Sequence, residues 1–510
     1  MQRVRQEELA QGKKRPTGRD LPKRPSRIAI RSRSTDSDSS GVSDPSSARS
    51  ESIALNTPVP SSSAAFDGGA TTFSPPRHPS QRLQLFIAPA VHELDPFDTL
   101  PTHGVPHKSV EGLLQYCFDT LLPMTFSIET ASYSERMARQ GLVLRQKATS
   151  PAVFLGFMAT VAAHRAILRG NHQDLAPSET NHDDLITDPD YKRVKHHTIV
   201  AVRKMIENRT ARVGQYLIDA CFGLVSVATI VGNFREARVH LQGISQMMSI
   251  AEISQESVEW LPITDVKLAT ALLSKPSLPL PWERQPIPQE ILQLVSPPSD
   301  SDQSRLGTSL THFAGLSSHL KELISRHRDI CDICEFNVQN QGSLSHLQNR
   351  TLNRKATELE YDLTAYPYET SLFERDHNNQ PIIPALENMV RLASLGLLAI
   401  APHAILPSTG SGRATTHHQK RAFEDWLRER RNNCGRPELQ VILWSLFCFI
   451  QCAEHQPEAD FFIQQLALLT RELWLIKWHN TEATMYGFLY IPGLQAKKWE
   501  NIYHSAMSVR

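Results

Sequence analysis

The sequence predicts an all-α protein, a multi-helix array that follows a disordered basic and Ser/Pro-rich N-terminal tail. Apolar residues recur at spacings of three and four in many segments after residue 100, which places them on one face of a helix. Alternating strand patterns are nearly absent. No repeat with a period of roughly 20 to 50 residues is recognisable. These observations together favour helices packed on helices.

The most informative stretch covers residues 214–282. Residues 216–231 are apolar on every face apart from Asp219, Ser226 and Thr229, which predicts a helix with no exposed side. This run is too short and too interrupted to span a bilayer, and no other apolar run is expected to reach that length. After a break at Gly232 and Asn233, an amphipathic helix is predicted. Its apolar stripe is Phe234, Ala237, Leu241, Ile244 and Met248.

A third helix in this stretch carries a shorter apolar stripe. Its members are Val266, Ala269, Leu272 and Leu273. The helix is expected to end at Pro276, Pro279 and Pro281, because proline lacks the N–H group that a helix needs.

Four short motifs carry a resemblance to a known family. They are GNFREARVHLQG (residues 232–243), DVK (265–267), PLPW (279–282) and DPFDTLP (95–101). Together they resemble the fungal-specific transcription factor domain, the large helical region that accompanies zinc-cluster DNA-binding domains. The resemblance covers the chain from about residue 95 to the last residue. It implies a helical regulatory body.

Composition limits where and how the chain acts. Its net charge is +1, so the chain as a whole has no field that would draw it to nucleic acid or to a membrane. Seven scattered cysteines, an odd number, favour a reducing compartment and free thiols. No apolar run near Met1 resembles the centre of a signal peptide. We therefore expect a soluble intracellular protein.

Residues 1–33 form a basic arm. They hold eleven lysines and arginines against three acidic residues, which leaves a net charge of +8. Two clusters, Lys13-Lys14-Arg15 and Lys23-Arg24, are of the kind read as nuclear localisation signals. Two alternatives stay open: a solvated tail without a receptor, and weak phosphate contact that is blind to sequence.

Residues 34–82 are expected to be a disordered linker. They are rich in Ser, Pro, Gly, Ala and Thr, and such a composition buries too little apolar surface to offset the entropy of ordering. Ser37, Ser39 and Ser40 are candidate phosphorylation sites, although an unmodified linker is the favoured interpretation.

The remaining chain is expected to form two helical lobes of one regulatory domain, residues 83–295 and 305–510. The proline-rich stretch after Pro276 and the Ser/Pro run at residues 296–304 interrupt the helical pattern between them. The alternative is that this interruption is a long surface loop.

Local signals place the helices of the first lobe. Ser109 is expected to cap a helix that Pro123 ends. Ser150 and Pro151 open an almost wholly apolar helix over residues 152–168, with proline in its first turn. A helix with a cationic face is predicted over residues 192–208.

Apolar periodicity predicts helices in the second lobe over residues 306–338, 385–405, 423–431, 438–452 and 461–478. Residues 363–384 hold three prolines and are expected to be irregular, and residues 407–418 are expected to be a polar loop. Glu387 and Arg391, four residues apart, are expected to pair on the exposed side of their helix.

Cysteine positions bear on zinc. A zinc binuclear cluster needs six closely spaced cysteines, because two zinc ions share thiolate bridges, and residues 1–100 contain none. Either the sequence starts late within a longer protein, or the chain is a clusterless member of the family it resembles. Such members typically begin with a short basic block, and residues 1–8 look like the end of one.

A second zinc site can be drawn around Cys331 and Cys334, with His327 and His346 near them in sequence. The CxxC pair lies in a helical pattern without the turns of a zinc knuckle, so unligated thiols are the favoured interpretation. Zinc and redox chemistry are the alternatives.

Other residues are interpreted as structural. His164, on an apolar helix, is expected to be a hydrogen-bonded core residue. Trp444, Trp474 and Trp478 are spaced as helix-packing residues, with an aromatic ligand pocket as the alternative. No HExxH, GxSxG, glycine-rich phosphate loop or paired-carboxylate segment appears. We predict no enzyme, no catalytic residue, no metal ligand and no cofactor.

The sequence therefore predicts a nuclear transcriptional regulator of the fungal-specific type, whose helical body is an interaction or ligand-sensing domain. By resemblance, its targets are expected in a metabolic gene cluster, one for a specialised metabolite. The alternative is a cofactor or scaffold that binds no DNA and associates with a zinc-cluster transcription factor. Expected partners are the transcription machinery or a DNA-binding protein. DNA is contacted only weakly and non-specifically by the arm, no membrane is involved, and homodimers or heterodimers are left open.

Overall fold

The computed structural model describes residues 100–102, 104–128, 133–148, 150–173, 185–208, 214–248, 255–369, 373–377, 381–429 and 434–509, with the backbone alone at 255–260. All of them belong to one compact unit, residues 78–510. The basic arm with its nuclear-localisation candidates, the Ser/Pro-rich linker and residues 95–99 of the DPFDTLP motif lie outside the described residues.

These residues form helices and no strand, so the prediction of an all-α fold is confirmed. The first part of the chain forms α3 (His107–Tyr116), the π-helical turn η2 (Cys117–Leu121), α4 (Leu122–Thr125), α5 (Tyr133–Lys147), α6 (Pro151–Leu168), α7 (Pro189–Glu207), α8 (Gln215–Val231), α9 (Phe234–Met248) and α10 (Gln255–Leu272). The second part forms α11 (Gln289–Val295), η5 (Asp302–Arg305), α12 (Thr308–Thr311), α13 (Ser318–Gln339), α14 (His346–Glu369), α15 (Ala385–Leu398), α16 (Gly410–Glu429), α17 (Arg436–Cys452), α18 (Glu458–Glu472), α19 (Trp478–Met485) and α20 (Pro492–Ser508).

The start and end of the first helix differ from the prediction. The residue that precedes α3 is Pro106, and Ser109 lies inside the helix, where its Oγ accepts a hydrogen bond from Arg193 Nη1 at 3.2 Å. Pro123 does not end the helical path either, because η2 leads directly into α4. Pro123 is the second residue of α4 and directly follows the π-helical turn. The predictions that Ser109 caps this helix and that Pro123 ends it were therefore wrong.

The apolar helix α6 begins as predicted. Ser150 precedes it and its Oγ accepts a hydrogen bond from Val153 N at 3.3 Å, and Pro151 is the first helical residue. By length and composition α6 is long and apolar enough to cross a membrane, so the expectation that no apolar run is long enough was wrong. Of this 18-residue helix, 78% is buried within the fold, as in the core helix of a globular protein.

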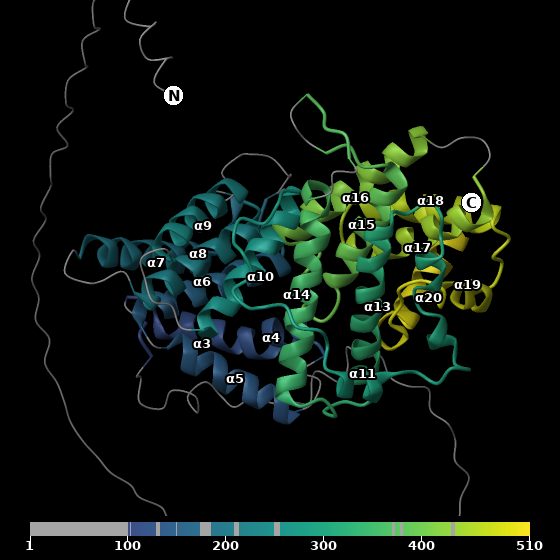
Figure 1. The fold of residues 1–510 in the computed structure, drawn as a ribbon. Coiled ribbons are helices and arrows are strands. Elements are labelled where there is room, and N and C mark those ends of the chain that lie inside the picture. The colour runs from purple at the N-terminus through teal and green to yellow at the C-terminus, as the bar shows by residue number, and fades with distance from the viewer. Residues whose placement is uncertain are drawn as a thin grey trace, which may run out of the picture. The chain divides into compact units, whose positions relative to one another are not determined.

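The helix predicted without an exposed side is α8, and it packs directly on α6 (Figure 1). Tyr216 near its first residue is half exposed, while most of the remaining side chains are buried. The two helices meet at Gly156 and Gly223: a Cβ on Gly223 would come within 2.7 Å of the Gly156 backbone. Only glycine at this point lets the two backbones approach so closely.

Three clusters of buried side chains form the core of the described residues. Two are built from residues 105–231 and 152–278, and the third joins Ile128 to residues 291–506. Helix α10 packs against α8 and α9 as well as α14 and α16, so it connects the clusters (Figure 1). The division into lobes at residues 83–295 and 305–510 stays a prediction.

Two segments expected to be irregular are helical in part, over residues 363–369 and 410–418, while their other described residues are irregular as predicted. Helix α14 continues through Pro367 to Glu369, although a helical proline leaves the carbonyl four residues earlier without a donor. That carbonyl is Leu363 O, and Arg391 Nη1 donates to it at 3.3 Å. Helix α16 begins at Gly410 inside the predicted polar loop. Its polar residues Thr416 and Gln419 are buried, which polarity in the sequence does not reveal.

Glu387 and Arg391 are neither exposed nor paired with each other. Both are buried on α15. Glu387 accepts a hydrogen bond from the Tyr366 hydroxyl, and Arg391 also donates to Asn388 Oδ1 at 2.9 Å. The predicted ion pair was wrong because neighbouring helices supply both side chains with other partners.

Three predicted helices differ in extent from the prediction. The 306–338 segment is divided into α12 and α13, the 385–405 segment ends at Leu398, and the 461–478 segment ends at Glu472. As a consequence Trp474 and Ile476 lie in a connection and are 78% and 68% exposed. Trp474 was therefore wrongly assigned to helix packing, whereas Trp444 is fully buried and donates from Nε1 to Leu489 O at 2.7 Å.

Candidate functional site

The partly exposed side chains of α6 and α8 lie on one face of each helix. Between the first and last residues of α6 they are Phe157 and Thr160. Beyond the first two residues of α8 they are Asp219, Phe222, Ser226 and Ile230. Spacings of three and four keep them on one side of the helix. All six line the same pocket, so this is where the two most apolar helices remain accessible.

The pocket has a volume of about 290 Å³. Most of its lining is apolar and comes from η2, α4, α5, α6, α8, α10 and residues 403–411. Leu121, Phe126, Val143, Phe157, Phe222 and Leu406 are among the contributors. Small-molecule sites in proteins are typically concave, apolar and roughly 300–1,000 Å³ in volume. This pocket lies just below that range.

A segment from the second half of the chain closes one side of the pocket. Ala404 N donates to Thr125 O at 3.0 Å, which joins residues 403–406 to the end of α4. The rings of Phe126 and His403 meet edge to face with their centres 5.6 Å apart. The guanidinium of Arg139 lies 4.3 Å above the centre of the Phe126 ring. These contacts fix residues 403–406 as one wall of the pocket.

Lys147, the last residue of α5, brings a cation to the pocket. Burial lowers its pKa below the ordinary value, and the carboxylate of Asp219 offsets part of that effect. Lys147 Nζ lies 5.9 Å from the centre of the Phe222 ring, and no carboxylate among the described residues forms an ion pair with it. Asp219 Oδ1 accepts from Gln215 Nε2 at 2.9 Å.

The other basic groups of the lining have partners or are neutral. Lys267 Nζ forms a 2.6 Å ion pair with Glu360. Burial lowers the pKa of His403 to about 3, with lesser effects from the positive charges of Lys267 and Arg139. Burial also lowers the pKa of His164 to about 4. Lys147 and Asp219 are the remaining ionisable groups of the lining.

His164 occupies the place that the sequence predicted for it. It is buried on α6, and its Nδ1 lies 2.8 Å from the hydroxyl of Tyr116. The interpretation as a hydrogen-bonded core histidine is confirmed, although its side chain also reaches the pocket.

The GNFREARVHLQG motif forms a joint between helices. Gly232 ends α8 with a φ of +101°, a conformation that favours glycine. Asn233 Oδ1 accepts from Glu236 N at 3.2 Å and so caps α9. Glu236 Oε2 then accepts from Lys195 Nζ of α7 at 2.9 Å. A Cβ on Gly410, the first residue of α16, would collide with the backbone of Gly232.

The DVK and PLPW motifs connect α10 to α14. Lys267 of α10 pairs with Glu360 of α14, and Trp282 Nε1 donates to Glu358 Oε1 at 2.9 Å. Glu358 also accepts from Lys355 at 2.5 Å. The motifs that carry the family resemblance thus hold together helices that are distant in sequence.

The CxxC pair lies inside α13, where Cys331 and Cys334 are both fully buried. Burial raises the pKa of each thiol above its ordinary value, which opposes the thiolate that metals bind. His327 is buried on the same helix, whereas His346 is exposed at the start of α14. Within the described ranges, no three His, Cys, Asp or Glu side chains are arranged to hold a metal.

Comparison of the chain with protein-family models, with curated proteins and with solved structures finds no match.

Sequence reasoning missed the pocket, although one signal pointed to it. Asp219, Ser226 and Thr229 interrupt the apolar surface of α8, and all three line the pocket. A polar residue on an otherwise buried helix needs a partner or a cavity, so these positions marked the face. The contribution of residues 403–411 had no such signal, because they come from a distant part of the chain.

Proposed function

We propose that the chain is a nuclear transcriptional regulator of the fungal-specific type, whose helical body senses a small molecule and engages a partner protein. The observation that carries this proposal is the pocket beside the GNFREARVHLQG joint. Residues 409 and 411 line the pocket, and Gly410 between them packs against Gly232. A ligand would therefore act directly on the position of α16 relative to α8. By resemblance, the regulated genes belong to a metabolic gene cluster, one for a specialised metabolite.

The basic arm supplies nuclear import in this proposal. We expect a fluorescent fusion of the full chain to leave the nucleus when Lys13, Lys14, Arg15, Lys23 and Arg24 are all replaced by alanine, because import receptors read clustered positive charge. A matched variant with Arg27, Arg31 and Arg33 replaced should stay nuclear. Undiminished nuclear accumulation of the first variant would show that the two clusters are not the signal.

Chromatin occupancy of the tagged protein in its native host tests the regulatory role. Sharp peaks upstream of a small set of genes, with altered transcription of those genes on deletion, support it. Uniform background at normal expression levels would contradict it.

A cofactor that binds no DNA itself is the second candidate. It is favoured by the net charge of +1, which gives the chain as a whole no field that would draw it to nucleic acid. Peaks that survive removal of residues 1–33 but vanish on deletion of a co-purifying zinc-cluster factor would favour this candidate. Peaks that survive loss of every such factor would exclude it.

A further inference from the structure

The pocket combines an apolar body with one cation that lacks an ion-pair partner. Phe157, Phe222 and Ile230 present hydrocarbon from α6 and α8, and they are among the few side chains of those helices that stay partly exposed. An apolar ligand of modest size would cover this surface and remove it from water.

The polar groups of the lining differ in whether they are already paired within the protein or can still bind a ligand. Lys267 is already held by Glu360 at 2.6 Å, and the imidazole of His403 is neutral near pH 7. Asp219 accepts a hydrogen bond from Gln215. Lys147 Nζ has neither an ion pair nor a hydrogen bond among the described residues, although burial disfavours its charge. A charge removed from water in this way gains from an anionic partner.

We propose that the pocket binds a small apolar carboxylic acid, whose carboxylate pairs with Lys147 and whose hydrocarbon body packs between Phe157 and Phe222. This assignment deepens the sensing role and rests on the proposed function for its consequence in the cell. Binding itself depends only on the helical body. The carboxylate lies on the Lys147 side, and the hydrocarbon extends toward the wall formed by residues 403–406.

The test uses the purified full chain and two probes with the same ring system, 2-naphthoate and 2-naphthalenemethanol, measured by isothermal titration calorimetry at pH 7. We expect 2-naphthoate to bind at least roughly tenfold more tightly than the alcohol, because a charge-assisted hydrogen bond forms at Lys147. Equal affinities, or no detectable binding of either probe at millimolar concentration, would overturn the assignment.

Three variants locate the site. Lys147→Met keeps the length of the side chain and should remove the preference for 2-naphthoate while leaving the affinity for the alcohol within about twofold. Ser226→Leu fills the pocket and should weaken both probes. Lys192→Met, on the exposed surface of α7, is the control and should change neither. Helical circular dichroism of each variant confirms that it is folded.

An unchanged preference for 2-naphthoate in Lys147→Met, or undiminished binding of both probes in Ser226→Leu, contradicts the assignment. The outcomes are separable from those of the proposed function. Binding of 2-naphthoate without nuclear import or chromatin peaks would support the ligand site and contradict the regulatory function. Chromatin peaks without binding of 2-naphthoate would contradict only the ligand assignment.

Discussion

At the scale of single residues, buried polar side chains decide much of this fold. Arg391 donates to Leu363 O, the carbonyl left without a helical donor by Pro367. His418 was expected in a polar loop but is a partly buried residue of α16, and its Nε2 lies 2.8 Å from Ala271 O. Because a carbonyl only accepts, Nε2 of His418 carries the proton. Each of these groups has its partner on another helix.

His327 makes stability depend on pH in the acid range. It is 1% exposed, its Nδ1 has no hydrogen-bond partner in the described structure, and burial lowers its pKa to about 3. Below about pH 6.5, His327 is protonated in the unfolded chain but stays neutral in the folded chain. Proton binding then stabilises the unfolded state, so the protein loses stability as the pH falls. Between pH 7 and pH 5, the free energy of unfolding of His327→Leu should fall by about 2 kcal/mol less than that of the wild type. Urea unfolding at the two pH values measures both changes. Parallel losses in the two proteins would contradict this assignment.

Asp265 has the opposite effect on the pH dependence of stability: its contribution stabilises the protein at low pH. It is buried on α10, and its Oδ2 accepts from Leu278 N at 2.7 Å. Burial raises its pKa to about 6, against which the hydrogen bonds from Leu278 and Ser277 act. The folded chain therefore binds a proton more readily, and this contribution is full below about pH 4 and is lost as the pH rises through 6.

We expect Asp265→Asn to remove that contribution. The gain in unfolding free energy that protonation of Asp265 provides between pH 7 and pH 4, at most about 3 kcal/mol, should be absent from the variant. The measurement is the difference in urea unfolding between wild type and variant at each pH. A difference that does not change with pH would show that Asp265 does not titrate in this range.

At the scale of elements, the crossing of α6 and α8 is set by two glycines and one threonine. A Cβ on Gly223 would lie 2.7 Å from Gly156 C, and Thr160 Oγ1 of α6 donates to Gly223 O of α8 at 3.4 Å. Since backbone atoms cannot move aside as the end of a side chain can, the two helices have no room to accept a methyl group. The same crossing places Phe157 and Asp219 on the pocket wall.

Gly223→Ala should therefore destabilise the protein by about 1–3 kcal/mol, although alanine favours helix more than glycine does. Gly243→Ala in α9 is the matched control, because a Cβ there meets nothing within 4 Å. The control should gain about 0.5–1 kcal/mol. Urea unfolding of the three proteins checks both signs, and a stabilised Gly223→Ala would show that the helices can separate at little cost.

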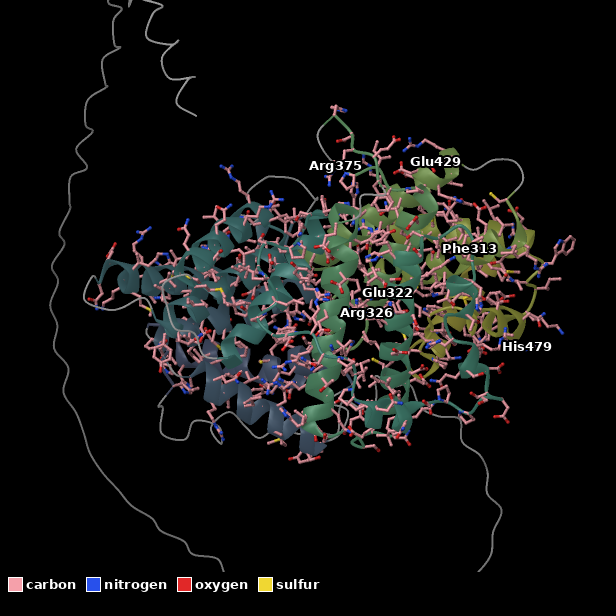
Figure 2. The ribbon with its side chains drawn as sticks, in the orientation of Figure 1. Phe313, Glu322, Arg326, Arg375, Glu429 and His479 are labelled. Atoms are coloured by element: carbon pink, nitrogen blue, oxygen red, sulfur yellow. The ribbon has the colours of Figure 1, made fainter. Side chains whose placement is uncertain are left out.

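At the scale of the whole compact unit, charged contacts between α10 and α14 connect the core clusters. Lys267 pairs with Glu360, and beyond α10 Lys275 pairs with Glu369 at 3.0 Å. Arg326 of α13, labelled in Figure 2, donates to Asp362 of α14 at 2.7 Å. The first pair is largely buried, whereas the side chains of Lys275 and Glu369 are about half exposed.

These two pairs allow a controlled comparison. Glu360→Ala leaves the buried ammonium of Lys267 without its partner and should cost about 3–5 kcal/mol of unfolding free energy. Glu369→Ala removes an exposed pair between neighbouring segments and should cost less than about 1 kcal/mol. Thermal or urea unfolding measures both, and equal losses would mean that burial does not set the strength of this contact.

Local signals in the sequence were sufficient for the helix class and for several helix ends. Ser150 and Pro151 mark the start of α6, and Gly232 marks the end of α8, as predicted. Prediction failed where a distant residue supplied a partner, as Arg391 does for Leu363 O across 28 positions. It also failed at Trp474, because the helix before it ends at Glu472 and not six residues later.

The sequence by itself determined the all-α class, the apolar identity of α6 and α8, and the polar positions on α8, because caps and apolar stripes act over three or four residues. Only the tertiary structure decided that Asp219, Ser226 and Thr229 face a pocket, that residues 403–411 close it, and that Lys147 stands there without an ion pair. These features depend on which distant segments meet. That meeting is settled by the packing of whole helices, such as the glycine crossing of α6 and α8, and not by any local pattern.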